Sequence, residues 1–144
     1  MIMKILSGCI VLNEKKEIFL LWRNKHSWYE TPGGKIDPEE CFDVKNPTIP
    51  ELQHAAIREL NEEVKGITCI REIKYFGSVN FQIPDKREAT AHKFIVYVEG
   101  NLSPNEDIFD AKKSRFFSIS ELKKQPLSRD LSLLLEKIQL ELNL

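Results

Sequence analysis

Residues Arg58-Glu59-Leu60-Asn61-Glu62-Glu63 form the stretch that decides the fold of this chain. At about 100° of rotation per residue in an α-helix, its three glutamates fall within an arc of roughly 100°. Ile57, Leu60 and Val64 fall on a neighbouring arc, which predicts a helix with one face toward a core. Like charges at this spacing repel, by about 0.2–0.5 kcal/mol per pair. The cluster is either an exposed charged face or a site for a hard cation such as Mg²⁺, which takes carboxylate oxygens as ligands.

This hexad resembles the signature of the Nudix hydrolases. The signature reads Gly, five residues, Glu, seven residues, Arg-Glu, an aliphatic residue, any residue, Glu-Glu, any residue, Gly. In this chain five residues separate Gly34 from Glu40, and Pro32-Gly33-Gly34-Lys35 is also similar to the family. The resemblance favours the metal site and implies an α/β fold, an α/β/α sandwich around a mixed β-sheet. It implies a single domain over 1–144, with the signature at about 34–67.

The chain departs from the signature at two places. Seventeen residues, rather than seven, separate Glu40 from Arg58, which indicates an insertion at about 42–51. Thr48-Ile49-Pro50-Glu51 has the form of a capping box, so the helix is predicted to restart near Ile49. Both Glu40 and Glu51 are therefore candidates for the glutamate that braces Arg58. The insertion is either a harmless surface loop, since loop closure costs little entropy, or a lid that shapes specificity.

The second departure lies at the end of the helix, where Val64 and Lys65 precede Gly66 and the signature has one residue. Gly66 is predicted to end the helix as its left-handed cap.

The resemblance implies a metal centre and assigns its residues. Glu59, Glu62 and Glu63 hold one or more Mg²⁺ or Mn²⁺ ions, and the backbone carbonyl of Gly34 completes the shell. The predicted catalytic residues are Glu59, as the proton-accepting base, with Glu62 and Arg58. A phosphoanhydride is shielded by its own negative charge, so its cleavage needs cations on the phosphate oxygens and an activated water.

The predicted substrate contacts are weaker and come from several segments. Arg23, at the end of an apolar run, and Lys35 are candidates for phosphate contacts, or are plain surface residues. Gly33 lets the backbone approach the phosphates. Glu99 and Glu106 lie where relatives sometimes draw an extra ligand or base, although both also fit ordinary surface polarity. The candidates for stacking on a base or walling its pocket are Trp28, Tyr29, Phe81, Phe94 and Pro126–Asp130.

The function that the resemblance implies is hydrolysis of a phosphoanhydride bond in a nucleoside diphosphate derivative. A nucleoside or deoxynucleoside triphosphate pyrophosphatase, giving a monophosphate and pyrophosphate, is preferred for so short a chain. The alternatives are ADP-ribose or dinucleoside polyphosphate hydrolysis. A regulatory domain that binds nucleotides without cleaving them is a further alternative, although such domains commonly lose the signature glutamates that this chain retains.

Composition limits the partners. The 144 residues carry a net charge of −1, so no general attraction to nucleic acid or to a membrane is expected. Three widely spaced cysteines form neither a metal-ligand pair nor a disulfide framework, which favours a reducing, cytoplasmic setting. No apolar run approaches the roughly 20 residues of a membrane helix. The expected partner is a small nucleotide, and a homodimer is possible.

Periodicity and turn residues predict the elements. Strands are expected at Ser7–Leu12 and Glu17–Arg23 as a hairpin, one short strand within the loop Asn24–Glu40, and strands near Cys69–Phe81 and Ala91–Glu99 joined across Pro84-Asp85-Lys86. A helix is expected over about Ile49–Lys65. Gly100–Lys113 is expected to be loop, followed by a strand at Ser114–Phe117. Ser118 and Ser128 are expected to cap two further helices, the second with a buried leucine stripe.

Overall fold

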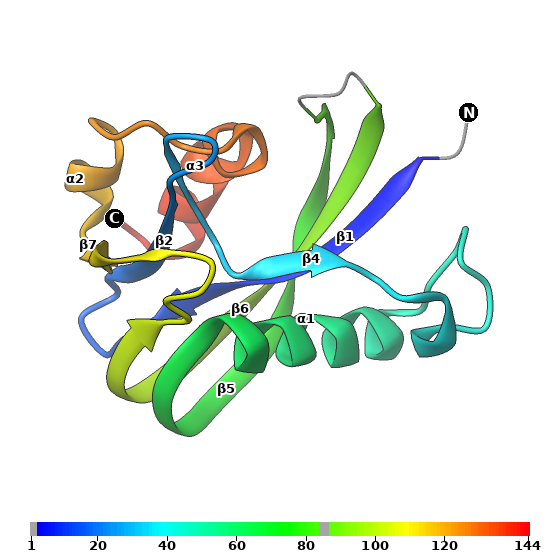
Figure 1. The fold of residues 1–144 in the computed structure, drawn as a ribbon, viewed down its shortest axis with the longest axis horizontal. Helices are drawn as coiled ribbons and strands as arrows, with labels where there is room; N and C mark the ends of the chain where they lie inside the picture. Colours follow the sequence, from blue (N-terminus) through cyan, green and yellow to red (C-terminus); the bar gives the residue numbers. More distant parts are fainter. Residues whose placement is uncertain (1–2, 84–86) are drawn as a thin grey trace.

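The computed structural model describes residues 3–83 and 87–144 (Figure 1). Its strands are β1 (Lys4–Leu12), β2 (Ile18–Arg23), β3 (Trp28–Glu30), β4 (Gly33–Lys35), β5 (Val64–Gln82), β6 (Glu88–Pro104) and β7 (Asp110–Phe117). Its helices are the 3-10 turn η1 (Pro38–Glu40), α1 (Ile49–Glu63), α2 (Ile119–Leu122) and α3 (Arg129–Glu141). The turn expected at Pro84-Asp85-Lys86 lies outside the described residues.

Within the described residues the seven strands form one mixed sheet, whose main path runs β3-β2-β1-β6-β5. β4 pairs with β1, and β7 pairs with β2. Only β1 and β6 are parallel among these pairs, and α1 lies in the long connection between them. Parallel strands need such a crossover, whereas the antiparallel β1–β2 pair needs only the predicted hairpin.

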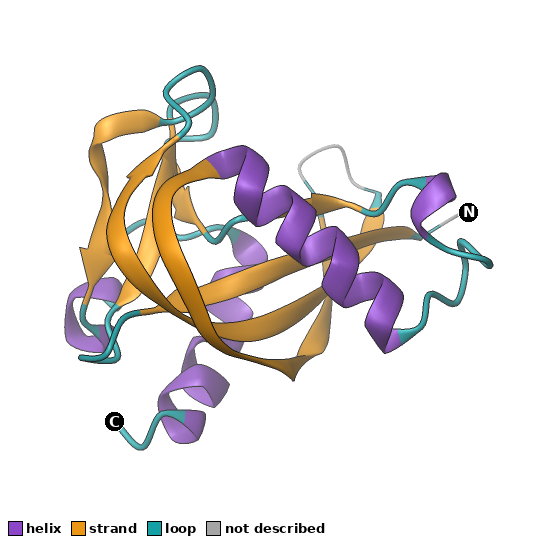
Figure 2. Ribbon diagram, turned by 90° about the horizontal axis from the view of Figure 1, so that it is seen from below, coloured by secondary structure: helices purple, strands orange, loops and turns teal. Residues whose placement is uncertain are grey.

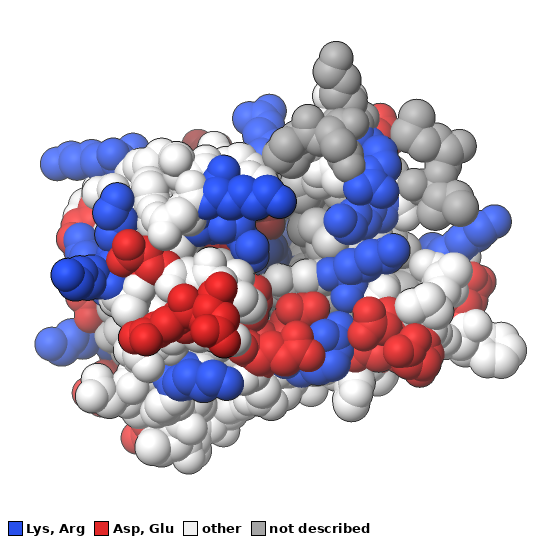
Figure 3. All heavy atoms as spheres, in the orientation of Figure 1, with Lys and Arg blue, Asp and Glu red and all other residues white. Residues whose placement is uncertain are grey.

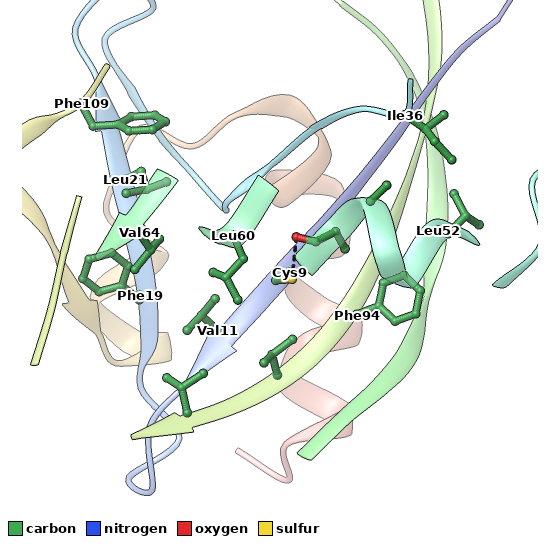
Figure 4. Packing of buried hydrophobic residues seen from close by; sticks show 14 residues of the cluster. Cys9, Val11, Phe19, Leu21, Ile36, Leu52, Leu60, Val64, Phe94 and Phe109 are labelled. Carbon is green, nitrogen blue, oxygen red and sulfur yellow. Dashed lines mark hydrogen bonds between the residues drawn. The ribbon is translucent and has the colours of Figure 1, made fainter. Parts of the chain in front are cut away.

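Alternate residues of β1 face opposite sides of the sheet, because side chains in a strand alternate. Cys9 and Val11 join a core cluster with Leu52, Ala56 and Leu60 of α1 (Figure 4). Ile10 and Leu12 join a second cluster that contains Leu131, Leu134, Ile138 and Leu142 from α3 and the residue after it. Figure 2 shows α1 across one face of the sheet and α3 behind the other. The predicted α/β/α sandwich and the buried leucine stripe are confirmed.

The start of α1 follows its sequence signal. The Thr48 hydroxyl accepts a hydrogen bond from the Glu51 backbone N–H at 3.3 Å, and Glu51 Oε1 accepts one from the Thr48 N–H at 2.8 Å. The helix therefore begins at Ile49 as predicted. Ser118 and Glu121 form the same reciprocal pair at α2. Ser128 occupies the N-cap position of α3 as predicted, but its side chain makes no capping hydrogen bond.

The end of α1 differs from the prediction. The helix stops at Glu63, and Val64 is already extended and opens β5. Gly66 has a φ of +91°, but it lies in a β-bulge of β5 and does not cap the helix. The helix end is held instead by Asn105, whose backbone N–H donates to the Glu63 carbonyl at 2.8 Å and whose amide donates to the Glu62 carbonyl at 3.1 Å.

The strands are longer than their apolar runs. β5 and β6 extend well beyond the predicted ranges, and the predicted loop Gly100–Lys113 is wrong at both ends, where β6 continues to Pro104 and β7 starts at Asp110. The Asn24–Glu40 segment holds two short strands instead of one. Much of this backbone is exposed and polar, so pairing with a neighbouring strand, and not a buried face, fixes its conformation.

The insertion forms an exposed loop followed by the first turn of α1. Phe42 and Val44 are exposed, and the Phe42 backbone N–H is held by Glu51 Oε2 at 2.8 Å. Cys9, Cys41 and Cys69 are all free thiols, and Cys9 is buried. Across residues 3–83 and 87–144, no helix has the length and apolar character to cross a membrane.

Candidate active site

The C-terminal, acidic end of α1 lies beside β4 and beside the connection between β6 and β7. Figure 3 shows acidic side chains gathered in a band over α1 and β4, with basic side chains bordering it. Glu59, Glu62 and Glu63 all belong to this end of the helix but differ in exposure, with 13%, 56% and 6% of their side chains exposed. The three glutamates therefore lie on one side of the helix, but their side chains differ in exposure.

Glu63 is the most deeply buried carboxylate of the three. Its Oε1 accepts a hydrogen bond from the Gly33 backbone N–H at 2.7 Å, and its Oε2 lies 3.8 Å from Arg23 Nη2. Burial raises the pKa of Glu63 to about 8, and the nearby Glu59 and Glu30 add to the rise against the effects of Gly33 and Arg23. A cation bound here would offset the cost of an ionised carboxylate in this buried position.

Glu59 lies against the backbone of Gly34. A Cβ atom at Gly34 would come within 2.6 Å of the Glu59 carboxyl carbon, so a larger residue there would displace the Glu59 carboxylate. Burial raises the pKa of Glu59, although the charge of Arg58 works against the rise. The predicted glycine and the predicted base are thus in direct contact.

Arg58 is braced by Glu40. Its Nε and Nη2 donate to the two oxygens of Glu40 at 2.8 and 2.7 Å, a bidentate pair. Its Nη1 lies 3.1 Å from one oxygen each of Glu59 and Glu62. The hydrogen bond from Arg58 lowers the pKa of Glu40, against the effect of burial. Glu51, the other candidate brace, is occupied with the helix cap and Phe42.

Arg23 is fixed by contacts that the sequence did not reveal. Its Nε and Nη2 donate to the oxygens of Glu30 at 2.8 and 3.1 Å, and Trp28 Nε1 donates to the same carboxylate at 3.0 Å. The guanidinium also lies over the Phe109 ring, 4.8 Å from its centroid. Arg23 is therefore held between β3 and the β6–β7 connection, close to Glu63.

A cavity of about 810 Å³ opens beside these residues. Arg23, Gly33 and Gly34 line it, as do the predicted wall residues Trp28 and Phe81. Parts of Pro126–Asp130 also contribute, through Ser128, Arg129 and Asp130. This volume lies in the usual range for a small-molecule site.

The carboxylates at this end of α1 are candidate ligands for a hard divalent cation. In the described part of the chain, no three metal-ligating side chains lie close enough together to form a ready-made cluster. Arg58 holds two of the three glutamates, while Glu63 remains a buried carboxylate with a raised pKa beside bare glycine backbone. Oxygen donors of this kind are those that Mg²⁺ and Mn²⁺ prefer.

Several predicted residues lie elsewhere. Glu99 is exposed and borders a separate hollow of about 640 Å³, with its Oε1 3.8 Å from Arg71. Glu106 lies in the exposed turn before β7. Lys35 is exposed, and it is its backbone carbonyl that accepts from Arg58 at 3.3 Å. Tyr29 and Phe94 are core residues and do not line the cavity.

Other residues of the site were not predicted from the sequence. Glu30 and Lys93 line the cavity, and Asn105 holds the end of α1. Each is brought to the site by sheet pairing or packing between distant segments, which a local motif does not encode.

Comparisons with known proteins identify the family. A family model described as the NUDIX domain matches residues 5–137. The MutT protein of Methanosarcina mazei Go1 is similar in structure, with 23% identity, a TM-score of 0.72 and coverage of 96% of this chain and 94% of that one. A MutT Nudix hydrolase from Burkholderia pseudomallei has 19% identity, a TM-score of 0.70 and coverage of 92% and 95%.

A C. elegans Ap4A hydrolase in a binary complex has 15% identity, a TM-score of 0.67 and coverage of 96% and 98%. The comparison with curated proteins finds no match. Identities this low show a common fold, whereas the family model covers nearly the whole chain. The chain therefore belongs to the Nudix family and is a Nudix-type pyrophosphohydrolase acting on acid anhydrides.

Proposed function

We propose that this protein, working as one domain, hydrolyses nucleoside or deoxynucleoside triphosphates to a monophosphate and pyrophosphate. One observation carries the proposal. The 810 Å³ cavity runs onto the Gly33-Gly34 backbone, where Glu63 accepts a hydrogen bond and Glu59 lies in contact. A nucleotide in this cavity would have its phosphates beside the acidic end of α1.

The proposed metal ligands are Glu59, Glu62, Glu63 and the carbonyl of Gly34. Mg²⁺ or Mn²⁺ bound there would neutralise phosphate charge and lower the pKa of a water. Arg58 is held by Glu40, and its hydrogen bonds orient the carboxylates of Glu59 and Glu62.

Glu59 is the proposed base. It is mostly buried, and burial raises its pKa, which makes it a better proton acceptor than an ordinary surface glutamate. It takes a proton from the attacking water as that water adds to a phosphorus of the α–β anhydride. The bond from that phosphorus to the bridging oxygen then breaks, and its two electrons leave with the other fragment, so the products are a monophosphate and pyrophosphate.

Arg23 is the proposed phosphate contact. Two of its nitrogens are committed to Glu30, and Nη1 has no hydrogen-bond partner among the described residues. A guanidinium already fixed in place loses little entropy when it binds a phosphate. Lys35, the other predicted phosphate contact, is exposed on β4 and is not among the residues that line the cavity.

ADP-ribose and dinucleoside polyphosphates are the alternative substrates, and the second class has a fold neighbour in the Ap4A hydrolase. We also propose a cytoplasmic setting, which suits the exposed free thiol of Cys69. A homodimer is a prediction that sedimentation measurements test.

The experiment is a substrate panel with Mg²⁺ or Mn²⁺ at mildly alkaline pH. It holds normal and oxidised nucleoside triphosphates, ADP-ribose, diadenosine polyphosphates and a nucleotide sugar, with phosphate and pyrophosphate measured separately. Pyrophosphate release from triphosphates, abolished by chelator, is the expected result. Cleavage confined to ADP-ribose or to diadenosine polyphosphates would overturn the substrate class. Nucleotide binding without any cleavage would indicate a regulatory domain.

A further inference from the structure

A buried ion pair lies in the cavity, away from the signature glutamates. Lys93 of β6 is 5% exposed, and its Nζ lies 2.8 Å from Asp130 Oδ2 in the first turn of α3. The same ammonium donates to Thr31 Oγ1 at 2.8 Å. Lysine is almost never this buried without partners. Burial by itself raises the pKa of Asp130, but the charge and hydrogen bond of Lys93, with smaller contributions from the Ser128 hydroxyl and the Leu131 backbone N–H, together lower it.

Ser128 adds an unsatisfied group to this pair. It is 5% exposed, and its hydroxyl makes no hydrogen bond of ordinary distance and angle within the described residues. It nonetheless lies near enough to Asp130 to contribute to the lowered pKa of that carboxyl. A buried polar atom without a partner is rare and needs an explanation. A ligand in the cavity supplies one.

These four side chains, Thr31, Lys93, Ser128 and Asp130, come from three separate parts of the chain and all line the 810 Å³ cavity. We call them the Lys93 cluster. The cavity also holds the larger side chains of Trp28, Phe81 and Leu133, which provide faces for a flat ring. If the phosphates of a nucleotide lie at Gly33 and Arg23, its base is the part that occupies this space.

Counting donors indicates the base. An ammonium has three N–H donors, and Lys93 uses two of them on Asp130 and Thr31, which leaves one. The Ser128 hydroxyl supplies a second free donor beside the same carboxylate. A carbonyl oxygen has two lone pairs and accepts both donors, whereas a ring nitrogen has one in-plane lone pair and accepts one. Asp130 then accepts the ring N–H that stands next to the carbonyl in an oxo base.

We propose that the Lys93 cluster binds the base of the substrate and selects 6-oxopurines over 6-aminopurines. This inference rests on the proposed triphosphate pyrophosphatase activity, and it names the specificity-determining residues of that same site. With a 6-aminopurine, either the Lys93 ammonium or the Ser128 hydroxyl keeps an unpaired donor. A buried donor without a partner costs binding free energy.

The test compares inosine and adenosine nucleotides, because these differ only at position 6 and the adjacent ring nitrogen. The rate constant kcat/KM is measured for ITP and ATP with Mg²⁺, and Kd is measured for the monophosphates IMP and AMP, which cannot be cleaved to pyrophosphate. Ser128→Ala and Lys93→Met are compared with the wild type. Lys74→Met is the matched control, since it breaks an exposed ion pair with Glu141 outside the cavity.

The wild type and Lys74→Met are expected to favour inosine by about tenfold or more in both measurements. Ser128→Ala reduces this ratio by about threefold or more, and Lys93→Met brings it near one. Lys93→Met leaves Asp130 unpaired, so its folding is checked by circular dichroism; Ser128→Ala removes only a hydroxyl and provides the test if Lys93→Met does not fold.

A wild-type ratio near or below one overturns the inference, and so does a preference that survives in both folded variants, because the cluster would then be only structural. If no triphosphate is cleaved but IMP binds more tightly than AMP, and Ser128→Ala removes the difference, the proposed reaction fails and the base selection stands. If triphosphates are cleaved without base preference, the proposed reaction stands and the base selection fails.

Discussion

The environment of Glu63 is unfavourable for an ionised carboxylate. The side chain is 6% exposed and lies near Glu59 and Glu30, and its pKa is raised from 4.5 to about 8. Folding therefore favours the protonated form of this group. Its contribution to stability is full below about pH 4.5 and is lost as the pH rises through about 8.

We expect the melting temperature of the protein in chelator to fall as the pH rises from about 5 to about 8.5, because Glu63 must then ionise in a buried site. Thermal unfolding followed by circular dichroism measures this. Glu63→Gln removes the ionisation and should flatten the slope. Glu62→Gln is the control, since this more exposed side chain should leave the slope unchanged. Equal slopes in the wild type and Glu63→Gln would contradict the raised pKa.

The two glutamates upstream of Arg58 are expected to have separable roles. Glu40→Gln weakens the bidentate hold on Arg58 and should lower kcat/KM by about tenfold, with little change in melting temperature. Glu51→Gln weakens the start of α1 and should lower the melting temperature slightly without changing kcat/KM. Steady-state kinetics and thermal unfolding on both variants check this. The reverse assignment would show that Glu51 braces the arginine.

Residues that stand close together in sequence were predictable at this scale. The hexad and Gly34 were identified because helical spacing and the signature are local, and the structure brings Glu59, Glu63 and Gly34 into proximity. Glu30 and Lys93 were not, because their places depend on strand register. A lysine in an apolar strand run is the one signal that was available for Lys93.

At the scale of elements, the insertion at 42–51 lies apart from the cavity. Residues 42–46 are exposed, and no residue of the 42–51 segment lines the 810 Å³ cavity. The structure therefore favours a harmless loop over a lid, and long surface insertions cost little entropy.

Replacement of residues 42–47 by a short Gly-Ser link should leave the ranking of substrates unchanged and kcat/KM within about twofold, because Thr48 remains to start α1. The Ap4A, ADP-ribose and triphosphate rates of the shortened protein measure this, with the full-length chain as control. A changed ranking would mean that the loop reaches the substrate.

Element starts were easier to predict than element ends. Capping boxes at Thr48 and Ser118 fixed two helix starts, because the cap is a local hydrogen-bond pattern. The end of α1 and the full length of β5 and β6 were not predictable, since Asn105 and the partner strand determine them from elsewhere in the chain.

For the molecule as a whole, the sheet joins two core clusters, one under α1 and one under α3. Adjacent residues of β1 belong to different clusters, so disruption of either face affects the same strand. The proposed active site depends on both, because its glutamates come from α1 and the Lys93 cluster includes the first turn of α3.

We expect the protein to unfold in one cooperative transition. Leu60→Ala under α1 and Leu131→Ala under α3 should each lower the free energy of unfolding by about 2–5 kcal/mol, because both side chains are fully buried. Urea unfolding followed by near- and far-UV circular dichroism should give coincident curves in each variant. Two separate transitions would show that the two faces unfold independently.

The most direct test of the account is pyrophosphate release from a nucleoside triphosphate by the wild type, Glu62→Gln and a matched Glu136→Gln variant with Mg²⁺. Glu62→Gln removes one charge from the proposed metal site on an exposed position, and we expect turnover to fall by about two orders of magnitude or more with an unchanged melting temperature. Glu136→Gln, on the exposed face of α3, should match the wild type. Undiminished turnover in Glu62→Gln would contradict a metal-dependent hydrolase built on the acidic end of α1.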